Sequence, residues 1–316
     1  MKLIIQIPCL NEEETLPVSL QALPREIPGV DVVEWLLIDD GSTDNSVRVA
    51  RENGVDHVLS FTGNKGLAKA FTAGLEKCVS LGADIIVNTD ADNQYDARDI
   101  PALVQPILNK EAEYVVGARP IDTTTDFSTA KKILQKIGSW VVRIASGTDI
   151  PDAPSGFRAM SRDCAKQINV YNEFTYTLET LIQAGHKNIA ITSVPIHTNK
   201  VDRPSRLFKS IPAYIYRSIL TIIRIFVIYK PFRFFMSIAL LLFGLGFLLG
   251  LRFLYFYFIG EGGGHIQSVI LSGVLLGIGV QAAFIAFIAD LLAANRKLLE
   301  QLKYKLNNQA DEKDHD

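Results

Sequence analysis

Two aspartates separated by one residue, Asp90 and Asp92, could bind a divalent cation. They come directly after the apolar run at residues 83–89, which is typical of a buried strand. Two carboxylates at the exit of one strand can turn oxygen ligands toward the same small volume, which suits Mg²⁺ or Mn²⁺ carrying a diphosphate. Surface turns can share this spacing, so the interpretation depends on the elements around the pair.

Three apolar segments upstream of this pair have the length of strands, and each runs into a polar loop. They lie at residues 3–8, 33–38 and 57–61. Helices are expected after Asn11–Glu14, after Asp39–Asp44 and from Leu67 to about Leu81. Strands that alternate with helices in this way predict right-handed βαβ crossovers and an α/β fold with a mainly parallel sheet.

Four polar clusters fall at the carboxyl ends of the expected strands. They are residues 11–13, 39–44, 64–65 and 90–94. In parallel sheets of this kind, ligands bind at the carboxyl ends of the strands. We therefore expect the four clusters to meet in one binding site.

The same clusters resemble the successive motifs of family 2 glycosyltransferases, which have the GT-A fold. These motifs are Ile7–Glu13, Asp39–Asp44, Asn64–Gly66 and Asp90–Gln94. Ser155–Ala159 and Arg203–Leu207 are similar to the polyprenyl-phosphate branch, which includes dolichol-phosphate mannose synthase and the bactoprenol glucosyltransferases. The resemblance covers residues 3–210 and implies inverting transfer of a hexose from a UDP or GDP donor to undecaprenyl or dolichyl phosphate. It does not identify the sugar.

The metal and the donor nucleotide sugar account for most of the candidate site residues. Asp90 and Asp92 are the metal candidates, with Asp92 favoured as the direct ligand and Gln94 in support. The resemblance implies that the base and ribose are held by Pro8, Asn11, Glu13, Asp39, Asp40 and Lys65. It also implies that Glu179, on a helix expected over 173–184, contacts donor hydroxyls, and that Arg203, Ser205 and Arg206 close over the diphosphate. For Glu13, a carboxylate in the first turn of a helix is the alternative.

A second set of residues is expected to bind the phosphate of the acceptor. Arg119 follows the strand expected at 114–118, so it is predicted to point into the same site. The other candidates are Lys131, Lys132, Arg158 and Arg206. A solvated face is the alternative for the two lysines, and pairing with anionic lipid is the alternative for Arg206.

The reaction does not require a strong general base. A phosphate monoester has a second pKa of about 6, so the acceptor is mostly a dianion at neutral pH and already a nucleophile. Some relatives carry an aspartate, assigned as the base, where this chain has Gly156. Its absence leaves Asp152 as the candidate base.

Composition argues against several other classes of protein. The chain has 316 residues, 48% of them hydrophobic, and a formal net charge of −2, so nucleic acid is not an expected partner. Its 3 cysteines and 5 histidines show neither Cys-x-x-Cys nor metal-ligand spacing, so no disulfide framework or zinc site is expected. No signal peptide is visible, and the catalytic domain is expected in the cytoplasm.

Two apolar segments, 232–258 and 266–292, are long enough to cross a hydrocarbon core of about 30 Å. The loop between them lacks Lys and Arg, whereas basic residues stand before the first segment and after the second. These are Lys230, Arg233, Arg296, Lys297, Lys303 and Lys305. The positive-inside rule therefore predicts an integral membrane protein with two spans, both ends cytoplasmic, in a membrane such as the bacterial inner membrane.

The segment at 203–233 carries seven basic residues interleaved with apolar ones and no acidic residue. This pattern indicates amphipathic helices at the membrane interface, with a solvated connector as the alternative. The expected organisation is a GT-A domain over 1–202, interfacial helices over 203–231, two spans over 232–293, and a tail over 294–316. The tail is expected to be basic at first and disordered from Asn307. A homo-oligomer remains an open alternative to a monomer.

Two other functions compete with transfer to a lipid phosphate. A processive polysaccharide synthase could use the same catalytic core, but the chain has no Gln-x-x-Arg-Trp and shows two spans, too few for an obvious polymer channel. A non-catalytic membrane adaptor could retain the fold, but the intact Asp39, Asp90 and Asp92 argue against such decay.

The charge imbalance around the apolar segments generates a topology prediction. A cysteine placed at Gly263 should react with a membrane-impermeant maleimide in intact spheroplasts, because the loop is expected outside. A cysteine placed at Asn307 should react once the cytoplasmic face is opened. Labelling of the Gly263 position solely after opening would contradict the predicted orientation.

Overall fold

The computed structural model describes residues 1–120, 138–140, 142–144, 146–170, 176–199, 220, 223–224 and 227–313. The chain forms two compact units, residues 1–218 and residues 219–316. The division falls inside the segment at 203–231 that was expected to form interfacial helices. Most of that segment lies outside the described residues.

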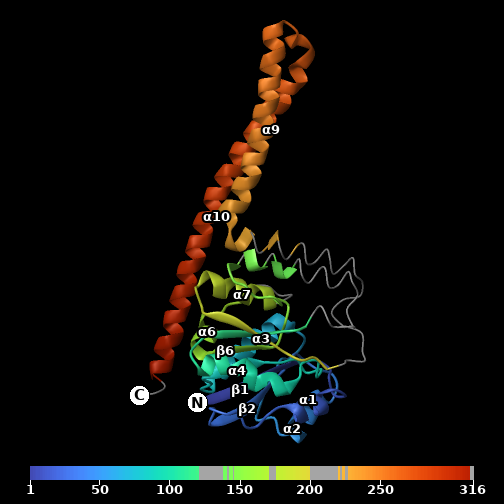
Figure 1. Ribbon diagram of the computed structural model, residues 1–316, viewed down its shortest axis with the longest axis vertical. Helices are drawn as coiled ribbons and strands as arrows, with labels where there is room; N and C mark the ends of the chain where they lie inside the picture. The colour runs from blue at the N-terminus through green and yellow to red at the C-terminus, as the bar shows by residue number, and fades with distance from the viewer. Residues whose placement is uncertain are drawn as a thin grey trace. The chain divides into compact units, whose positions relative to one another are not determined.

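The first unit is built on a seven-stranded sheet with the order β3-β2-β1-β4-β6-β5-β7 (Figure 1). The strands are β1 Lys2–Cys9, β2 Val32–Asp39, β3 His57–Ser60, β4 Ile85–Asn88, β5 Tyr114–Ala118, β6 Arg158–Ser161 and β7 Ile191–Pro195. All neighbouring pairs are parallel except those of β6, which runs antiparallel to β4 and β5. The predicted mainly parallel sheet is confirmed, while β6 and β7 were not predicted.

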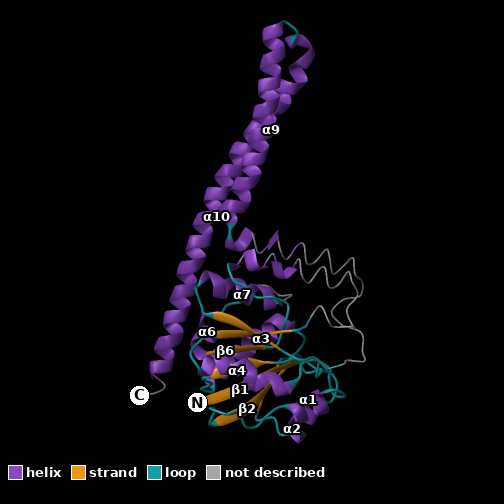
Figure 2. Cartoon of the chain, in the orientation of Figure 1, coloured by secondary structure: helices purple, strands orange, loops and turns teal. Residues whose placement is uncertain are grey.

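Helices cover both faces of this sheet, as the purple and orange elements of Figure 2 show. They are α1 Leu16–Ala22, α2 Ser46–Glu52, α3 Leu67–Ser80, α4 Ile100–Leu108 after the short η1 Ala97–Asp99, α6 Arg162–Gln167 and α7 Thr177–His186. The helix expected over 173–184 thus begins at Thr177 and ends at His186, and residues 171–175 lie outside the described part.

Alternation of side chains along the strands sorts the core into two layers. Leu3, Ile5 and Ile7 of β1 are buried with residues of α1 and α4 in one apolar cluster. Gln6 points to the other face, where a β-carbon at Gly74 of α3 would lie 2.4 Å from its Oε1 atom. The fold is therefore a three-layer α/β/α domain, and Gln6 is a polar residue in its interior.

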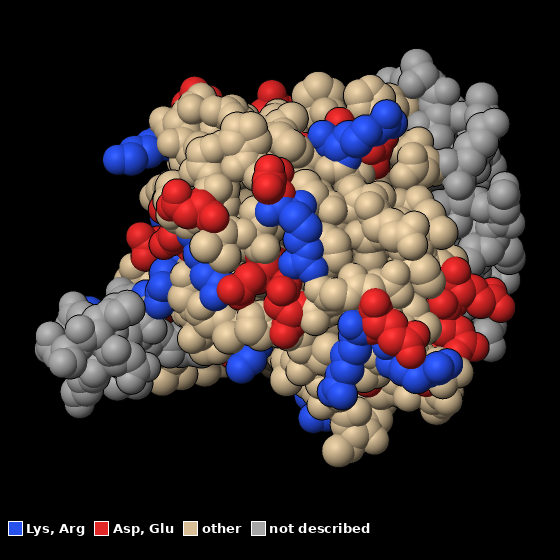
Figure 3. Space-filling model, turned by 90° about the horizontal axis from the view of Figure 1, so that it is seen from below, with Lys and Arg blue, Asp and Glu red and all other residues tan. Residues whose placement is uncertain are grey.

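Charged side chains are mixed on the face that Figure 3 shows, where acidic and basic residues alternate. The described part of this face therefore carries no patch of a single sign.

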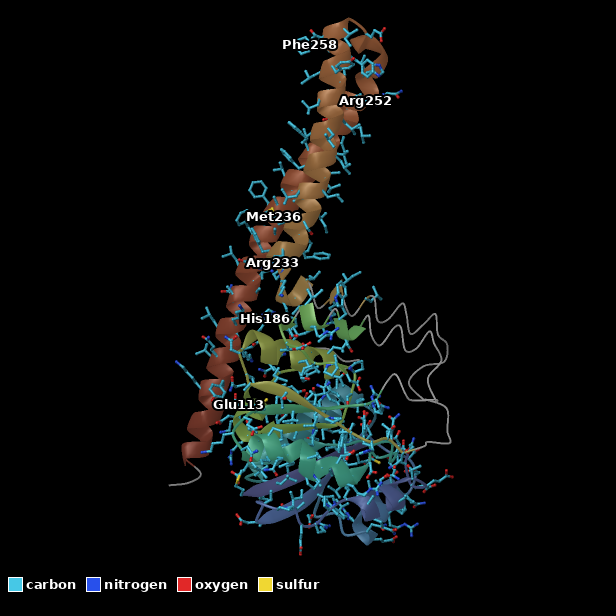
Figure 4. The ribbon with its side chains drawn as sticks, in the orientation of Figure 1. Glu113, His186, Arg233, Met236, Arg252 and Phe258 are labelled. Carbon is cyan, nitrogen blue, oxygen red and sulfur yellow. The ribbon has the colours of Figure 1, made fainter. Side chains whose placement is uncertain are left out.

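The described part of the second unit contains two long helices joined by a short turn. They are α9 Pro231–Ile259 and α10 Ile266–Lys313, with η2 Gly262–His265 between them. By length and composition, Pro231–Ile259 and Gly262–Leu302 could each cross a membrane. Arg233 and Phe258 mark the two ends of α9, and Arg252 lies near its C-terminal end over the ring of Phe256 (Figure 4).

Small residues allow α9 and α10 to approach closely. A β-carbon on Gly246 would lie 3.0 Å from the backbone nitrogen of Leu276, and one on Gly279 would lie 3.0 Å from that of Phe243. The Ser272 hydroxyl donates a hydrogen bond of 2.6 Å to the Gly246 carbonyl. Close contact through small residues, with a hydroxyl bonded across it, is how helices associate in lipid.

The end of α10 differs from expectation. The helix continues to Lys313, past Asn307, where the polar composition had indicated disorder. Gln309, Ala310, Glu312 and Lys313 are strong helix formers, and they extend a helix already begun upstream.

The loop after β2 generates a prediction about stability. Gly41 has φ of +79°, and a β-carbon there would lie 2.5 Å from the carbonyl carbon of Gly63. Gly82 has the same φ of +79°, with nothing within 4 Å of that position. We expect Gly82→Ala to cost about 1 kcal/mol for the left-handed backbone, and Gly41→Ala about 3 kcal/mol or more. Urea unfolding followed by tryptophan fluorescence would measure both, and equal losses would contradict the close approach of the two loops.

Candidate functional site

Asp90 and Asp92 lie just beyond the carboxyl end of β4, and both are half-buried. Burial, and then repulsion from Asp92, raises the pKa of Asp90 to about 7, while the positive charges of Arg119 and Arg158 act in the opposite direction. The Asp92 carboxylate accepts a hydrogen bond of 3.1 Å from the backbone N–H of Gln94. A carboxylate whose ionisation is opposed by a neighbouring carboxylate forms a place where a cation is stabilising.

The donor set fits a cation that arrives with a diphosphate. Among the described residues, no group of three or more His, Cys, Asp or Glu side chains could hold a metal ion. Mg²⁺ is commonly held by one or two carboxylates, with substrate phosphates and water completing its shell. Asp90 and Asp92 therefore suit Mg²⁺ or Mn²⁺ bound together with phosphate oxygens.

Asn11 and Glu13, both predicted to bind the nucleotide, bridge the loop after β1 to the loop after β2. Asn11 donates its backbone N–H to the Ser42 hydroxyl at 3.0 Å, and its side-chain oxygen accepts from the Thr43 N–H at 2.8 Å. The Glu13 carboxylate accepts from the backbone and side-chain nitrogens of Asn45 at 2.9 and 3.0 Å. The Glu13 carboxylate thus lies at the N-terminus of α2. The alternative placed Glu13 in the first turn of the helix that follows it, but that helix, α1, begins at Leu16.

Asp39 ends β2 and Asp40 follows it, and both are buried, at 5% and 4% exposure. The Asp40 carboxylate accepts from the backbone N–H groups of Lys65 and Gly66, at 2.7 and 2.9 Å. The ammonium group of Lys65 itself lies 4.7 Å from the centre of the Phe61 ring, and its side chain is exposed. The residues predicted to contact the base and ribose therefore form hydrogen bonds between their loops. These bonds hold the clusters at 11–13, 39–44 and 64–65 side by side.

Arg119 and Asp152 form a buried ion pair. The guanidinium donates through Nε and Nη2 to the two carboxylate oxygens of Asp152 at 2.7 and 2.9 Å, and the Arg119 backbone N–H adds a bond of 3.1 Å. The side chains are 9% and 1% exposed. Both oxygens of the Asp152 carboxylate are thus engaged by Arg119, and the role of Asp152 as a base stays a prediction.

The position of Arg158 overturns its predicted role at the acceptor phosphate. Its side chain is fully buried, at 0% exposure. It donates to the carbonyls of Ala153 and Ser155 at 2.7 Å each, to the Thr180 hydroxyl at 2.7 Å, and to the Tyr114 hydroxyl. All three guanidinium nitrogens are engaged inside the protein, so Arg158 anchors the turn at 153–156.

Three residues that the sequence reasoning missed surround this turn. The Gly156 carbonyl accepts from Asn88 Nδ2 at 2.9 Å, and its N–H donates to the Tyr95 hydroxyl at 2.9 Å. Asn88 Nδ2 also donates to the Tyr176 hydroxyl at 3.0 Å. Asn88 had a detectable signal, because it is a polar residue ending an apolar strand and it pairs in register with the buried Gln6 of β1. Tyr176 had no such signal.

Both tyrosines are held by stacked rings. The ring of Tyr176 stacks on Phe71 of α3 with centroids 3.8 Å apart, and that of Tyr95 stacks on Phe157 at 5.1 Å. Burial raises the pKa of Tyr95 to about 12, and it raises that of Tyr176 well above its usual value. Both hydroxyls therefore keep their protons at neutral pH.

Residues 198 and 199, which follow β7, are hydrogen-bonded to the loop that carries Asp92. After β7, Asn199 donates its backbone N–H to the Gln94 carbonyl at 2.9 Å and its side-chain amide to the Asn93 carbonyl at 3.0 Å. Tyr95 and Thr198 form an antiparallel bridge. The residues that lead toward position 203 are thus attached to the loop that carries Asp92.

The remaining candidates are placed as follows. Pro8 lies in β1 opposite Ile38 of β2, and Glu179 is buried at 3% exposure in the first turn of α7. Five predicted residues fall outside the described residues, namely Lys131, Lys132, Arg203, Ser205 and Arg206.

Comparisons with known proteins agree with this architecture. The family model described as "Glycosyl transferase family 2" matches residues 4–169. The undecaprenyl-phosphate mannosyltransferase of Micrococcus luteus is 32% identical over 177 residues, which are 54% of this chain and 70% of that protein. The UDP-N-acetylglucosamine–dolichyl-phosphate N-acetylglucosaminyltransferase of Methanococcus voltae is 31% identical over 215 residues, which are 61% and 83%.

Among solved structures, similarity extends to the fold. The glucosyl-3-phosphoglycerate synthase of Mycobacterium tuberculosis, in complex with Mn²⁺, UDP and glucosyl-3-phosphoglycerate, matches with a TM-score of 0.54. The identity is 20%, and the match covers 70% of this chain and 79% of that one. This likeness supports the GT-A fold.

The buried ion pair generates a testable prediction. Arg119→Ala or Asp152→Ala alone should cost about 3 to 5 kcal/mol of unfolding free energy, because each leaves its partner charged and buried. The double variant should cost clearly less than the sum, which a double-mutant cycle by thermal unfolding would measure. The exposed pair Arg48 and Glu52 is the control, with an expected coupling of about 0.5 kcal/mol. Additive losses at Arg119 and Asp152 would refute the buried pair.

Proposed function

We propose that this chain, which belongs to glycosyl transferase family 2, transfers one hexose from a nucleotide-diphosphate sugar to a polyprenyl phosphate at the cytoplasmic face of a membrane. The product would be a polyprenyl-phosphate sugar. Support for this acceptor comes from the relatives, which are named for transfer to undecaprenyl phosphate and dolichyl phosphate, and from the two apolar helices of the second unit.

The observation that carries the proposal is the carboxylate pair at the end of β4. Asp90 and Asp92 would hold Mg²⁺ or Mn²⁺, and the bound cation would offset negative charge on the departing nucleoside diphosphate. The mycobacterial synthase with the same fold has been solved with Mn²⁺ and UDP. The loops that carry Asn11, Asp39 and Lys65 are hydrogen-bonded to one another, and they would surround the base and ribose of the nucleotide.

Arg119 would attract the acceptor phosphate to the site. Its positive charge lowers the pKa of Asp90, which supports a role for Arg119 beside the carboxylate pair. Asp152 would hold the guanidinium in place, and a fixed cation brings two anionic substrates together without reorganising during the reaction. Lys131, Lys132 and Arg206 remain proposed partners for that phosphate.

The arrangement suits an acceptor that needs no general base. A phosphate dianion attacks directly, and a single displacement at the anomeric carbon inverts its configuration. Asp152 is occupied by Arg119, and Gly156 has no side chain. Arg203 and Ser205 would act on the diphosphate from the segment that follows Asn199.

Several finer points belong to the same proposal. The donor would carry UDP or GDP, both termini would be cytoplasmic, and the membrane would be the bacterial inner membrane. The basic residues near 203–233 would lie at its interface.

One assay separates the competing functions. Membranes containing the protein would be incubated with radiolabelled nucleotide sugars, polyprenyl phosphate and Mg²⁺ or Mn²⁺, and the products extracted into organic solvent. A labelled lipid of one sugar supports the proposal, a labelled polymer supports a processive synthase, and no product with any donor supports a binding protein.

The carboxylate pair generates a prediction for this assay. Asp92→Asn should lower transfer by at least about 100-fold, because the loss of one anionic ligand weakens the hold on the cation and its diphosphate. The protein should stay folded and membrane-bound. Asp163→Asn, an exposed change in the first turn of α6, is the matched control. Full activity of Asp92→Asn in excess Mg²⁺ or Mn²⁺ would contradict the metal assignment.

A further inference from the structure

The backbone of the loop at 90–94 determines where the carboxylates of Asp90 and Asp92 lie. Asn93, directly after Asp92, has a φ of +56°, a left-handed conformation that few residues other than glycine, asparagine and aspartate adopt. A backbone of this kind persists where the surrounding structure holds it. The bonds that reach this loop from the rest of the fold are therefore part of the site.

Ser19 holds the loop at the residue between the two aspartates. It is a buried residue of α1, and its hydroxyl donates to the Ala91 carbonyl at 2.7 Å. The same oxygen lies 3.1 Å from the Thr15 carbonyl, but a hydroxyl has one proton and the contact with Ala91 is the shorter. The Thr15 hydroxyl lies 3.4 Å from the Ala91 carbonyl and donates to the Glu12 carboxylate at 2.8 Å. Ser19 is therefore the main side-chain donor to this carbonyl.

Asn199 holds the loop on the other side of Asp92. Its backbone N–H donates to the Gln94 carbonyl at 2.9 Å, and its Nδ2 atom donates to the Asn93 carbonyl at 3.0 Å. A carbonyl can only accept, so the amide nitrogen and not the amide oxygen must face Asn93. The left-handed residue is thus held by its own carbonyl.

Both donors come from elements that are fixed in the fold. Helix α1 is anchored by Leu16 and Leu20, which are completely buried in the apolar core. The segment that carries Asn199 is anchored at His197, whose backbone N–H donates to the Asp99 carboxylate at 2.5 Å. The loop at 90–94 is therefore bonded on two sides to parts of the chain that resist displacement.

Fixed donors of this kind matter for a site that binds a cation. Ser19 and Asn199 bond to backbone carbonyls of the loop, so they would act on the cation through the position of the two carboxylates. Removal of groups that hold metal ligands in place commonly lowers the affinity for the metal about 10- to 100-fold.

We propose that Ser19 and Asn199 are positioning residues, which hold the loop at 90–94 from two sides so that Asp90 and Asp92 are already in place when Mg²⁺ or Mn²⁺ arrives. This inference rests on the proposed function, since it assumes that the carboxylate pair binds a metal nucleotide. Neither residue belongs to the sequence motifs at 7–13, 39–44, 64–66 or 90–94.

The test measures binding of Mn²⁺ and not transfer. The full chain in detergent, with saturating UDP or with saturating GDP, would be titrated with Mn²⁺, and the free ion followed by its electron paramagnetic resonance signal. Ser19→Ala and Asn199→Ala should each raise the apparent Kd for Mn²⁺ about tenfold, because the loop loses one of its two holds. Asp92→Asn gives the reference for a lost metal ligand.

Two variants serve as matched controls. Thr72→Ala removes a half-buried hydroxyl that donates to the Ala68 carbonyl of its own helix at 2.9 Å. Asn53→Ala removes a half-buried amide that donates to the Val49 carbonyl at 2.8 Å. Both should leave the Kd for Mn²⁺ unchanged, and thermal unfolding without metal or nucleotide would show how far each of the four variants is destabilised.

The outcomes separate this inference from the proposed function. Unchanged Mn²⁺ affinity in folded Ser19→Ala and Asn199→Ala, with normal binding to the unaltered chain, would overturn the positioning role and leave the metal assignment intact. An equal loss of affinity in the controls would assign the effect to general instability and overturn it too. If Ser19→Ala did not fold, Asn199→Ala would decide alone. If the unaltered chain bound no Mn²⁺ with either nucleotide, the metal assignment itself would fail, and the positioning role with it.

Discussion

The site depends on two buried arginines that fix one short segment of chain. Strand β6 runs against its neighbours, so its first residue, and not its last, lies at the carboxyl edge of the parallel strands. Arg158 occupies that position and binds the carbonyls of Ala153 and Ser155, while Arg119, at the end of β5, binds Asp152. A buried guanidinium is tolerated only when its N–H groups are bonded, so the segment at 152–158 has little freedom to move.

These arginines also balance the charge of the site. Asp90, Asp92 and Asp152 would leave the buried edge strongly negative, and Arg119 and Arg158 offset part of that charge. Burial and Asp92 still raise the pKa of Asp90 to about 7, so the compensation is incomplete. A cation that brings its own phosphate anions can complete it, which is the form in which a metal-bound nucleotide sugar would arrive.

Much of this could be predicted from the sequence because the signals were local. Apolar runs ending in Asp39 and Asp90 located the strands and the edge at which polar clusters meet. Contacts between residues far apart in the chain could not be predicted. Nothing in the sequence near Arg158 indicates that it contacts Tyr114 and Thr180. Likewise, nothing near Asp152 indicates that it pairs with Arg119. Arg158 was therefore predicted to bind the acceptor phosphate and Asp152 to act as the base, without sight of the buried partners that hold both side chains.

The motif residues of the nucleotide side illustrate a related limit. Asp40 and Glu13 have the types and spacing of ligand-binding residues, yet their carboxylates accept backbone N–H groups of neighbouring loops. A carboxylate that holds a loop and one that holds a ligand are identical in sequence. What distinguishes them is whether a peptide N–H arrives from elsewhere in the fold, and that is a property of the tertiary structure.

The state of positions 152 and 156 agrees with the proposed class of acceptor. A sugar hydroxyl as nucleophile would need a carboxylate beside the reacting carbon to take its proton. Here Gly156 offers none, and Asp152 is neutralised by Arg119. A lipid phosphate brings its charge with it and needs a cation more than a base, and the buried pair supplies a cation held in place. Positions 152 and 156 are thus compatible with a phosphate acceptor.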